Sequence, residues 1–269
     1  MPISLRAVPI VPALLLLLAH LPTSPLAAQA TDSVPTTASE PRPLPPPVKL
    51  WHFGVAVGGV AAVSLLDDDI QHWIMDNRTQ GMEDVANVWQ EWGGFYVPTG
   101  IAVGTLGLGL VTGKPEVTRT GARVATSVLG ATVVGRVMKK AIGRARPSEA
   151  DDQYTFDPFG DFNSFPSGHT LTAFALSTSL ADAIDNKWAD AGLYTLAAGT
   201  GVSRMIGNHH WFSDVVGGAL VGITVAKFVD GKWSLFGLQS PEFLVGPQGT
   251  GLRWTVDVPG LRGAPRARN

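Results

Sequence analysis

Six apolar segments of helical length, separated by shorter polar stretches, constrain the fold of this chain most strongly. They lie at about residues 50–66, 95–112, 121–138, 170–184, 190–206 and 211–229. Apolar runs of this length are longer than an ordinary strand and are typical of helices. Strand-like alternation is scarce before residue 235. The sequence therefore predicts an all-α fold, a helical bundle of about six core helices.

Two further stretches carry patterns of secondary structure outside the six apolar segments. Residues 67–92 carry apolar side chains at near-helical spacing, interrupted at Gly81, which indicates an amphipathic helical region. Near the C-terminus, apolar and polar residues alternate over 252–258, after a turn-rich stretch at 247–251. This pattern predicts a small C-terminal β-hairpin.

Whether the helices cross a membrane depends on their length and charge. A span needs about 20 predominantly apolar residues, and the segments at 50–66 and 95–112 come close to that requirement. The other four segments are shorter or contain charged residues such as Asp182, Arg204 and Asp214. Both a membrane-embedded bundle and a globular α-helical bundle are compatible with this pattern.

The composition excludes several kinds of chemistry. The chain has no cysteine, which excludes disulfides, thiolate zinc sites, iron–sulfur clusters and cysteine nucleophiles. Its formal net charge is −2 and it contains no run of Lys or Arg, so no nucleic-acid partner is expected. Any catalysis must use His, Asp, Glu, Ser, Lys or Arg.

The first of three polar blocks follows the third apolar segment. Lys139 and Arg146 are seven residues apart, so both can lie on one helical face. Pro147 disfavours the helical conformation for Arg146, which we expect to leave the helix end and turn inward. A Lys point charge and an Arg fork together suit a phosphate group. The alternative is a positive flank on an apolar helix.

The second block, Pro166-Ser167-Gly168-His169, opens the fourth apolar segment. Proline is favoured in the first turn of a helix, and a helix N-terminus binds anions through its free backbone N–H groups and its dipole. Gly168 allows a ligand to approach the backbone, and Ser167 can add a hydroxyl donor. His169 can then exchange a proton with the ligand. The alternative is an ordinary polar helix start.

The third block joins the fifth and sixth apolar segments. His210 and Asp214 are four residues apart, so on a helix their side chains meet on one face. A carboxylate that holds one imidazole nitrogen fixes the tautomer and raises the nucleophilicity of the other nitrogen. Arg204 adds a third cation across a turn at Gly207 and Asn208. The alternative is a surface ion pair.

Taken together, the blocks read K-x6-R-P, P-S-G-H and S-R-x5-H-x3-D. This pattern resembles the signature of the phosphatidic acid phosphatase type 2 superfamily, which also includes bacterial acid phosphatases and vanadium haloperoxidases. The resemblance covers about residues 50–230 and implies the helical bundle of that superfamily. Its fixed positions are Lys139, Arg146, Pro147, Pro166, Ser167, Gly168, His169, Ser203, Arg204, His210 and Asp214.

The resemblance implies a metal-independent phosphatase that hydrolyses phosphomonoesters through a phosphohistidine intermediate, with no cofactor. His210 would attack phosphorus, and Asp214 would orient it. His169 would protonate the leaving alcohol and then activate water. The phosphoryl oxygens would be bound by Lys139, Arg146, Ser167, Gly168 and Arg204.

Two other functions remain compatible with the three blocks. A vanadium haloperoxidase would hold vanadate in the same site, and a catalytically silent protein would only bind a phosphate or a lipid. Retention of both His169 and His210 argues against the silent protein, because binding alone needs no nucleophile. The expected partner is a phosphorylated lipid or a small phosphate ester, and membrane association stays open.

The N-terminus has the pattern of an export signal. Arg6 precedes an apolar run at 8–21, and Ala28-Gln29-Ala30 has the form of a cleavage site. An uncleaved membrane anchor is the alternative. We therefore expect export to the periplasm or cell envelope, with the site facing the periplasm. If residue 31 lies outside and three helices cross before Lys139, however, the site would lie in the cytoplasm.

The expected organisation follows from these patterns. It consists of a signal peptide at 1–30, a proline-rich linker at 31–48, the catalytic domain at 49–230 and a C-terminal tail at 231–269. The linker contains six prolines and cannot hold a helix, so it is expected to be extended.

Overall fold

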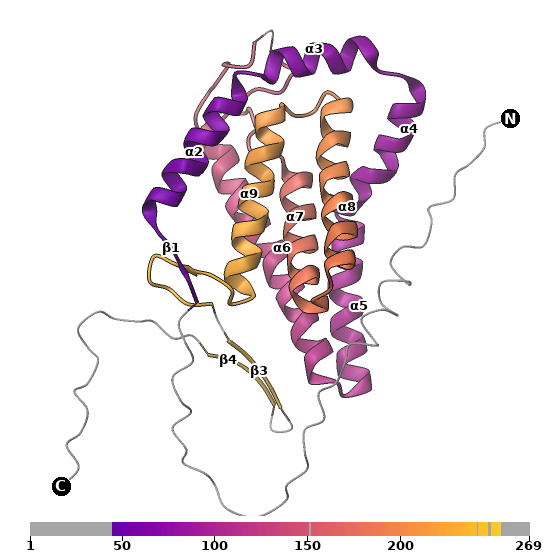
Figure 1. Cartoon of the computed structure of the whole chain (residues 1–269), viewed down its shortest axis with the longest axis vertical. Coiled ribbons are helices and arrows are strands. Elements are labelled where there is room, and N and C mark those ends of the chain that lie inside the picture. Colours follow the sequence, from indigo (N-terminus) through magenta and orange to yellow (C-terminus); the bar gives the residue numbers. More distant parts are fainter. Residues whose placement is uncertain (1–44, 151, 241, 247–248, 254–269) are drawn as a thin grey trace, which may run out of the picture.

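The computed structural model describes residues 45–150, 152–240, 242–246 and 249–253. Within these residues the chain is mainly helical (Figure 1). The helices are α2 (Leu50–Ser64), α3 (Asp67–Asn77), α4 (Gln80–Trp89), the 3₁₀ helix η1 (Gln90–Gly93), α5 (Tyr96–Thr112), α6 (Pro115–Ile142), α7 (Gly168–Ile184), α8 (Lys187–Ile206) and α9 (Phe212–Val229). The six apolar segments correspond to α2 and α5–α9, so the predicted all-α bundle is confirmed.

Helix α7 is the centre of the bundle and packs against α6, α8 and α9. Its side chains Leu171, Leu176 and Leu180 are completely buried. Gly222 of α9 allows the close approach of α7, because a Cβ atom there would lie 2.4 Å from the Leu171 carbonyl oxygen. The short distances between these helices hold the ends that carry the polar blocks in fixed positions.

The predicted amphipathic region forms α3 and α4, followed by η1, and covers one end of the bundle. Ile74 and Ala86 are buried against Met205 and Ile206 at the end of α8. The break between α3 and α4 falls at Arg78 and Thr79 rather than at Gly81. There the Thr79 hydroxyl accepts a hydrogen bond from the Met82 backbone N–H at 3.3 Å and caps α4.

Two small sheets lie beyond the C-terminal end of α9, at the end of the bundle away from α3 (Figure 1). Strand β1 (Pro47–Val48) pairs in parallel with β2 (Ser234–Leu235), so the last linker residues contact the chain that follows the bundle. Strands β3 (Glu242–Gly246) and β4 (Gly249–Arg253) form an antiparallel hairpin. The predicted C-terminal hairpin is therefore present, although most of the alternating stretch at 252–258 lies outside the described residues, as does the signal-like segment at 1–30.

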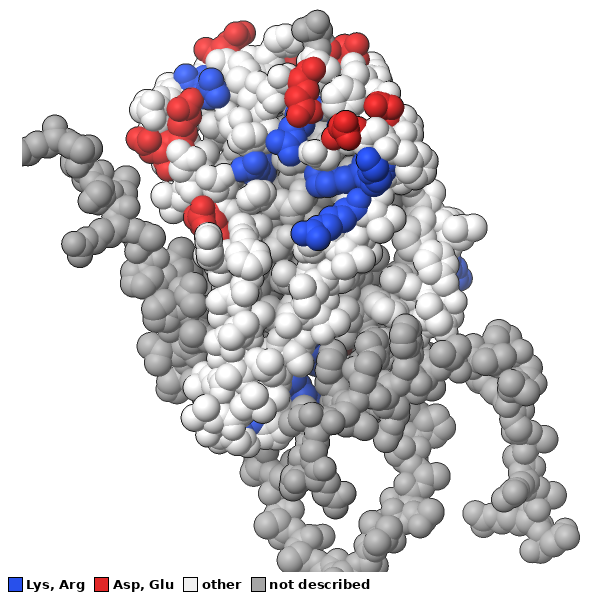
Figure 2. All heavy atoms as spheres, turned by 180° about the vertical axis from the view of Figure 1, so that it is seen from behind, with Lys and Arg blue, Asp and Glu red and all other residues white. Residues whose placement is uncertain are grey.

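Two of the described helical stretches are long and apolar enough to cross a membrane: Gln80–Thr112 and Phe212–Val229. Helices α2 and α3 pass the same test only together, across a bend of 49°. The prediction of a membrane span is therefore right for residues 95–112. Residues 50–66 pass the test only together with α3. Helix α9 passes it on its own, although its segment contains charged residues. On the face in Figure 2, Lys, Arg, Asp and Glu side chains gather mainly at one end, above a band with few of them. These features support a membrane protein.

Candidate active site

The three polar blocks converge at the end of the bundle where α6 and α8 end and α7 and α9 begin. Lys139 lies in the last turn of α6, which ends at Ile142, and Gly143 turns the chain with a φ of 57°. Arg146 therefore leaves the helix end, as predicted, and the two cations do not share a helical face. They meet instead at Asn163. The Lys139 ammonium donates to the Asn163 carbonyl oxygen, and Arg146 Nη2 donates to Asn163 Oδ1 at 2.7 Å.

The second block places His169 in the first turn of α7. The helix begins at Gly168 with Ser167 as its N-cap residue, so Pro166 lies before the helix and not in its first turn. The Ser167 backbone N–H donates to the Asp214 carbonyl oxygen at 3.0 Å, which joins the start of α7 to that of α9. The first N–H groups of α7 have no partner within the helix and can bind an anion.

The third block brings His210 and Asp214 together, but not as neighbours on one helix. His210 precedes α9, whose N-cap residue is Trp211, and Asp214 lies in its first turn. The His210 Nδ1 atom lies 3.5 Å from Asp214 Oδ2. Asp214 Oδ2 also accepts the Trp211 backbone N–H at 3.0 Å. The contact therefore follows from the cap of α9, which folds the carboxylate back toward the preceding residues.

The cations of the site retain donors that no protein group uses. Arg204, at the end of α8, is buried, and its Nη1 donates to Gln90 Oε1 at 2.5 Å. Its Nε atom, like Arg146 Nε, is buried without a hydrogen-bond partner in the described structure. A buried unpaired guanidinium donor is costly unless a ligand accepts from it. The two arginines are thus suited to an anionic ligand.

Both histidines of the site are electrically neutral near pH 7. Burial lowers the pKa of His210 to about 4, against the opposing effect of Asp214. Burial also lowers the pKa of His169 to about 4, and the positive charge of Arg204 adds to this effect. A neutral imidazole has a free lone pair, which a nucleophile needs.

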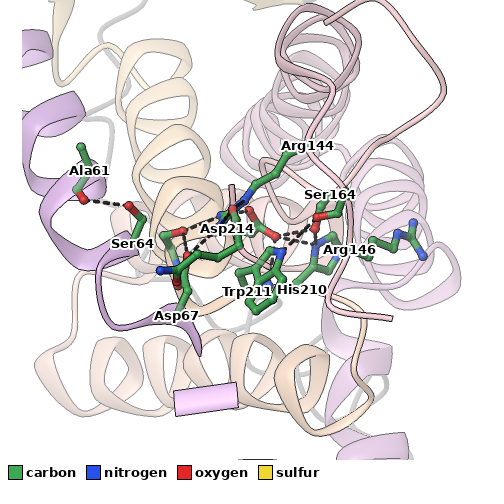
Figure 3. A network of polar contacts seen from close by, with 12 residues as sticks. Ala61, Ser64, Asp67, Arg144, Arg146, Ser164, His210, Trp211 and Asp214 are labelled. Atoms are coloured by element: carbon green, nitrogen blue, oxygen red, sulfur yellow. Dashed lines mark hydrogen bonds and ion pairs between the residues drawn. The ribbon is translucent and has the colours of Figure 1, made fainter. Parts of the chain in front are cut away.

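The structure adds a buried ionic network that the sequence analysis did not identify (Figure 3). Arg144 Nη1 lies 2.9 Å from Asp214 Oδ1, and its Nη2 lies 2.8 Å from Asp67 Oδ2. Both carboxylates are completely buried, and Arg144 is 3% exposed. Arg144 thus joins Asp67, the first residue of α3, to the carboxylate that contacts His210.

Two serines complete the hydrogen bonds of this network. The Ser164 hydroxyl donates to Asp214 Oδ2 at 2.5 Å. Asp67 accepts from both the backbone N–H and the hydroxyl of Ser213, at 2.7 and 2.5 Å. In Figure 3 the Arg146 side chain extends away from this network. The network thus surrounds the Asp214 carboxylate with protein donors, whereas Arg146 and Arg204 each keep a buried donor without a partner.

Some of these residues left a signal in the sequence. Arg144 lies two residues before Arg146, inside the first block, and just beyond the end of α6. Its place in the block was the one sequence feature that pointed to a role in the site. Asp67 begins an acidic run, but 77 positions separate it from Arg144, and no local pattern relates the two. Among the described residues, no group of three or more His, Asp or Glu side chains is arranged to hold a metal ion.

The fold and the site define a helical bundle in which cations and two histidines gather at one end. Residues 120–230 match the PAP2 superfamily. The stretch that holds all three blocks therefore matches this superfamily, in agreement with the resemblance found in the sequence. A solved structure with this fold is a transmembrane PAP2-type phosphatidylglycerolphosphate phosphatase from Bacillus subtilis, with a TM-score of 0.53 and 21% identity, covering 65% of this chain and 89% of that one.

Two curated relatives are similar over the same part of the chain. A lipid A 1-phosphatase from Porphyromonas gingivalis is 37% identical over 118 residues, which are 42% of this chain and 24% of the relative. A lipid A 1-phosphatase from Rhizobium etli is 33% identical over 107 residues, which are 38% of this chain and 45% of the relative. The chain thus spans less than half the length of either relative.

Proposed function

We propose that this protein is a phosphoric monoester hydrolase that acts on a lipid phosphate through a phosphohistidine intermediate, without a metal. One observation carries the proposal: two neutral histidines lie within reach of the charge of Arg204, and Arg146 and Arg204 keep buried, unpaired donors. Phosphoryl transfer depends mainly on positioning and on stabilising the charge of three equatorial oxygens. The similarity to two lipid A 1-phosphatases supports a lipid phosphate as the substrate class.

In the first step, His210 Nε2 attacks phosphorus. The N–P bond forms as the P–O bond to the leaving group breaks, and Asp214 accepts the Nδ1 proton in a hydrogen bond. His169 donates a proton to the leaving oxygen. The bound phosphate dianion raises the pKa of His169, because an opposite charge favours the protonated imidazole. His169 can therefore act as an acid once substrate is bound.

In the second step, His169 accepts a proton from water as the water oxygen attacks phosphorus. The N–P bond breaks, and inorganic phosphate leaves. In both steps the cations Lys139, Arg146 and Arg204 neutralise the phosphoryl oxygens. The Ser167 hydroxyl and the Gly168 N–H donate from the start of α7. Arg144 and Asp67 are positioning residues that hold Asp214 toward His210.

The proposal is tested by measuring phosphate release and the labelled phosphoenzyme. The substrates are a phosphatidic acid and a soluble phosphomonoester. In His210→Ala we expect turnover to fall by about three orders of magnitude or more, with no phosphoenzyme. Wild-type turnover in this variant would contradict the mechanism. Vanadate-dependent halide oxidation without phosphatase activity would support the haloperoxidase instead.

We further propose that the site faces the periplasm. The site lies at the N-terminal end of α9, whereas β1 pairs with β2 beyond the C-terminal end of that helix. The 18 residues of α9 span about 27 Å. If the bundle crosses the membrane, Pro47 and the site then lie on opposite sides. A signal that exports residue 31 is compatible with a periplasmic site only if α2, α5 and α6 do not all cross.

The absence of cysteine makes the two faces easy to label. Ser148, in the loop after α6, and Lys232, beyond α9, are both exposed. If the bundle crosses the membrane with the site toward the periplasm, a membrane-impermeant maleimide should label Ser148→Cys in intact spheroplasts and Lys232→Cys only after lysis. That pattern would also place Pro47 in the cytoplasm and would rule out export of residue 31. Labelling of both in intact spheroplasts would indicate a peripheral bundle outside the membrane, and the reverse pattern would contradict the proposed sidedness.

A further inference from the structure

The turn between α8 and α9 connects two groups of the proposed site, the Arg204 guanidinium and the His210 imidazole. Five residues separate them in the sequence. Helix α8 ends at Ile206, and Asn208 in the turn has a left-handed backbone conformation with a φ of 57°. A displacement of this turn would change the distance between the nucleophile and a cation that binds the phosphoryl oxygens. The groups that hold the turn therefore bear on the reaction.

The end of α8 receives hydrogen bonds from two sources. The last four carbonyl groups of a helix have no partner within it. Backbone N–H groups of residues 207–209 donate to three of them, at 2.9–3.0 Å. Side chains donate as well: Gln71 Nε2 to the Met205 carbonyl oxygen at 3.4 Å, and Arg78 Nη1 to that of Ile206 at 3.3 Å. Gln71 lies in α3 and Arg78 directly follows this helix, so the α3 region caps α8.

Gln71 also reaches the middle of the turn. Its Nε2 atom donates to Asn208 Oδ1 at 2.8 Å, in addition to the Met205 carbonyl oxygen. A carbonyl oxygen can only accept, so the contact with Met205 determines that the Nε2 end of the amide faces the turn. Gln71 is 7% exposed, and its two partners lie on either side of the helix end. One buried amide group therefore joins α8 to the turn that leads to His210.

Helix α3 contacts the segment that carries His210 at two points. Asp67 and Gln71 are four residues apart, so they lie on one face of α3. Gln71 binds Asn208, two residues before the histidine. Asp67 accepts a hydrogen bond from the backbone N–H of Ser213, three residues after it, at 2.7 Å. The nucleophile thus lies between two contacts with one helix, and the buried ionic network fixes the start of that helix (Figure 3).

We infer that Gln71 is a positioning residue for the proposed reaction, because its amide holds the turn that sets the distance between Arg204 and His210. The inference rests on the proposed phosphatase function and adds a residue to it. Gln71 lies outside residues 120–230, which match the PAP2 superfamily, and it acts through Asn208 rather than on the phosphate. A displacement of reacting groups by about 1 Å can lower a rate about 10²-fold, so the loss of this contact should be measurable in turnover.

The test measures kcat on a soluble phosphomonoester and the inhibition constant of vanadate, both with the full chain. Gln71→Met keeps the length of the side chain and removes its donors. We expect kcat to fall about tenfold with KM nearly unchanged, because the nucleophile and the cation act together mainly in the transition state. The inhibition constant of vanadate, which mimics that state, should rise by a similar factor. This constant refers to folded protein alone, so a loss of stability would not change it.

Two further variants make the test specific. Asn208→Gly removes the acceptor and retains a residue suited to the left-handed conformation. It should also lower kcat, and the double variant should be about as slow as Gln71→Met alone, because both changes break one contact. Asn77→Met is the matched control on an exposed position of α3, where the amide donates to the Trp73 carbonyl oxygen of the same helix. It should keep the wild-type kcat and the wild-type vanadate inhibition.

The outcomes separate this inference from the proposed function. Wild-type kcat and vanadate inhibition in Gln71→Met would overturn the positioning role, even if the variant were less stable. Losses in the two single variants that multiply in the double variant would overturn it as well, since Gln71 would then not act through Asn208. In both cases the phosphatase proposal would stand as long as His210→Ala is inactive. If His210→Ala releases phosphate as fast as wild type, the proposed function itself fails.

Discussion

Arg144 and Arg146 lie two residues apart but occupy opposite environments. Arg144 makes five hydrogen bonds, to Gln153, Ser213, Asp67 and Asp214, which equals the number of N–H donors in a guanidinium group. Arg146 bonds to Asn163 through Nη2 and keeps a buried Nε without a partner. An arginine with all donors satisfied by protein groups is structural, whereas one with unused donors is available to a ligand.

Replacing Arg144 should have the largest effect, because it damages both the fold and the site. Arg144→Met leaves Asp67 and Asp214 buried without their cation. Removing one partner of a buried ion pair costs about 3–5 kcal/mol of unfolding free energy. We expect lower thermal stability in detergent together with a loss of turnover. A variant with wild-type Tm would show that the network does not stabilise the bundle.

Arg146→Met should separate the stabilisation of the fold from the binding of the phosphate. The side chain points away from the buried network, so the unfolding free energy should change little (Figure 3). Turnover should fall by about 10²–10³, since a donor to the developing charge is lost. Thermal unfolding and kcat/KM measured on one preparation check this prediction. Equal losses of stability in Arg144→Met and Arg146→Met would contradict the proposed division.

Asp67→Asn tests the positioning role with a smaller change. Asparagine keeps the shape but weakens the acceptor for Arg144 and for Ser213. We expect kcat to fall about tenfold with KM unchanged, because Asp214 remains but is held less firmly. The more conservative Asp67→Glu should not restore activity if position matters more than charge. A change confined to KM would instead place Asp67 in substrate binding.

The bundle and the three blocks could be predicted because their signals are local. Apolar segments of helical length predicted α2 and α5–α9, and the blocks fell at the ends of these helices, which the fold brings together. The pairing of Arg144 with Asp67 could not be predicted, because it depends on where α3 crosses the end of the bundle. Helix boundaries caused the remaining errors: Pro166 and His210 lie just before α7 and α9 rather than within them, where hydrogen bonds and caps determine their directions. The departure of Arg146 from the end of α6 was predicted from Pro147.

The pH dependence of stability is expected to depend on His210. Its pKa is lowered from 6.5 to about 4 in the folded protein. Between these values the unfolded chain binds more protons than the folded one, so the unfolding free energy falls as the pH falls. The decrease is at most about 1.4 kcal/mol per pH unit from this group. Tm measured from pH 7 to pH 4.5 should decline less steeply in His210→Gln than in wild type, and equal slopes would contradict this.

Removal of divalent metals should have the smallest effect. In the proposed mechanism, Lys139, Arg146 and Arg204 supply the positive charge that a metal ion would otherwise provide to the phosphoryl oxygens. We therefore expect phosphate release after incubation with EDTA to match the untreated sample. Vanadate should inhibit the same preparation, because it adopts the trigonal-bipyramidal geometry of the transition state. Activity that disappears in EDTA and returns with Mg²⁺ would show that these cations are not sufficient. A metal ion would then have to bind the phosphoryl oxygens together with Arg146, whereas the structural role of Arg144 would be unaffected.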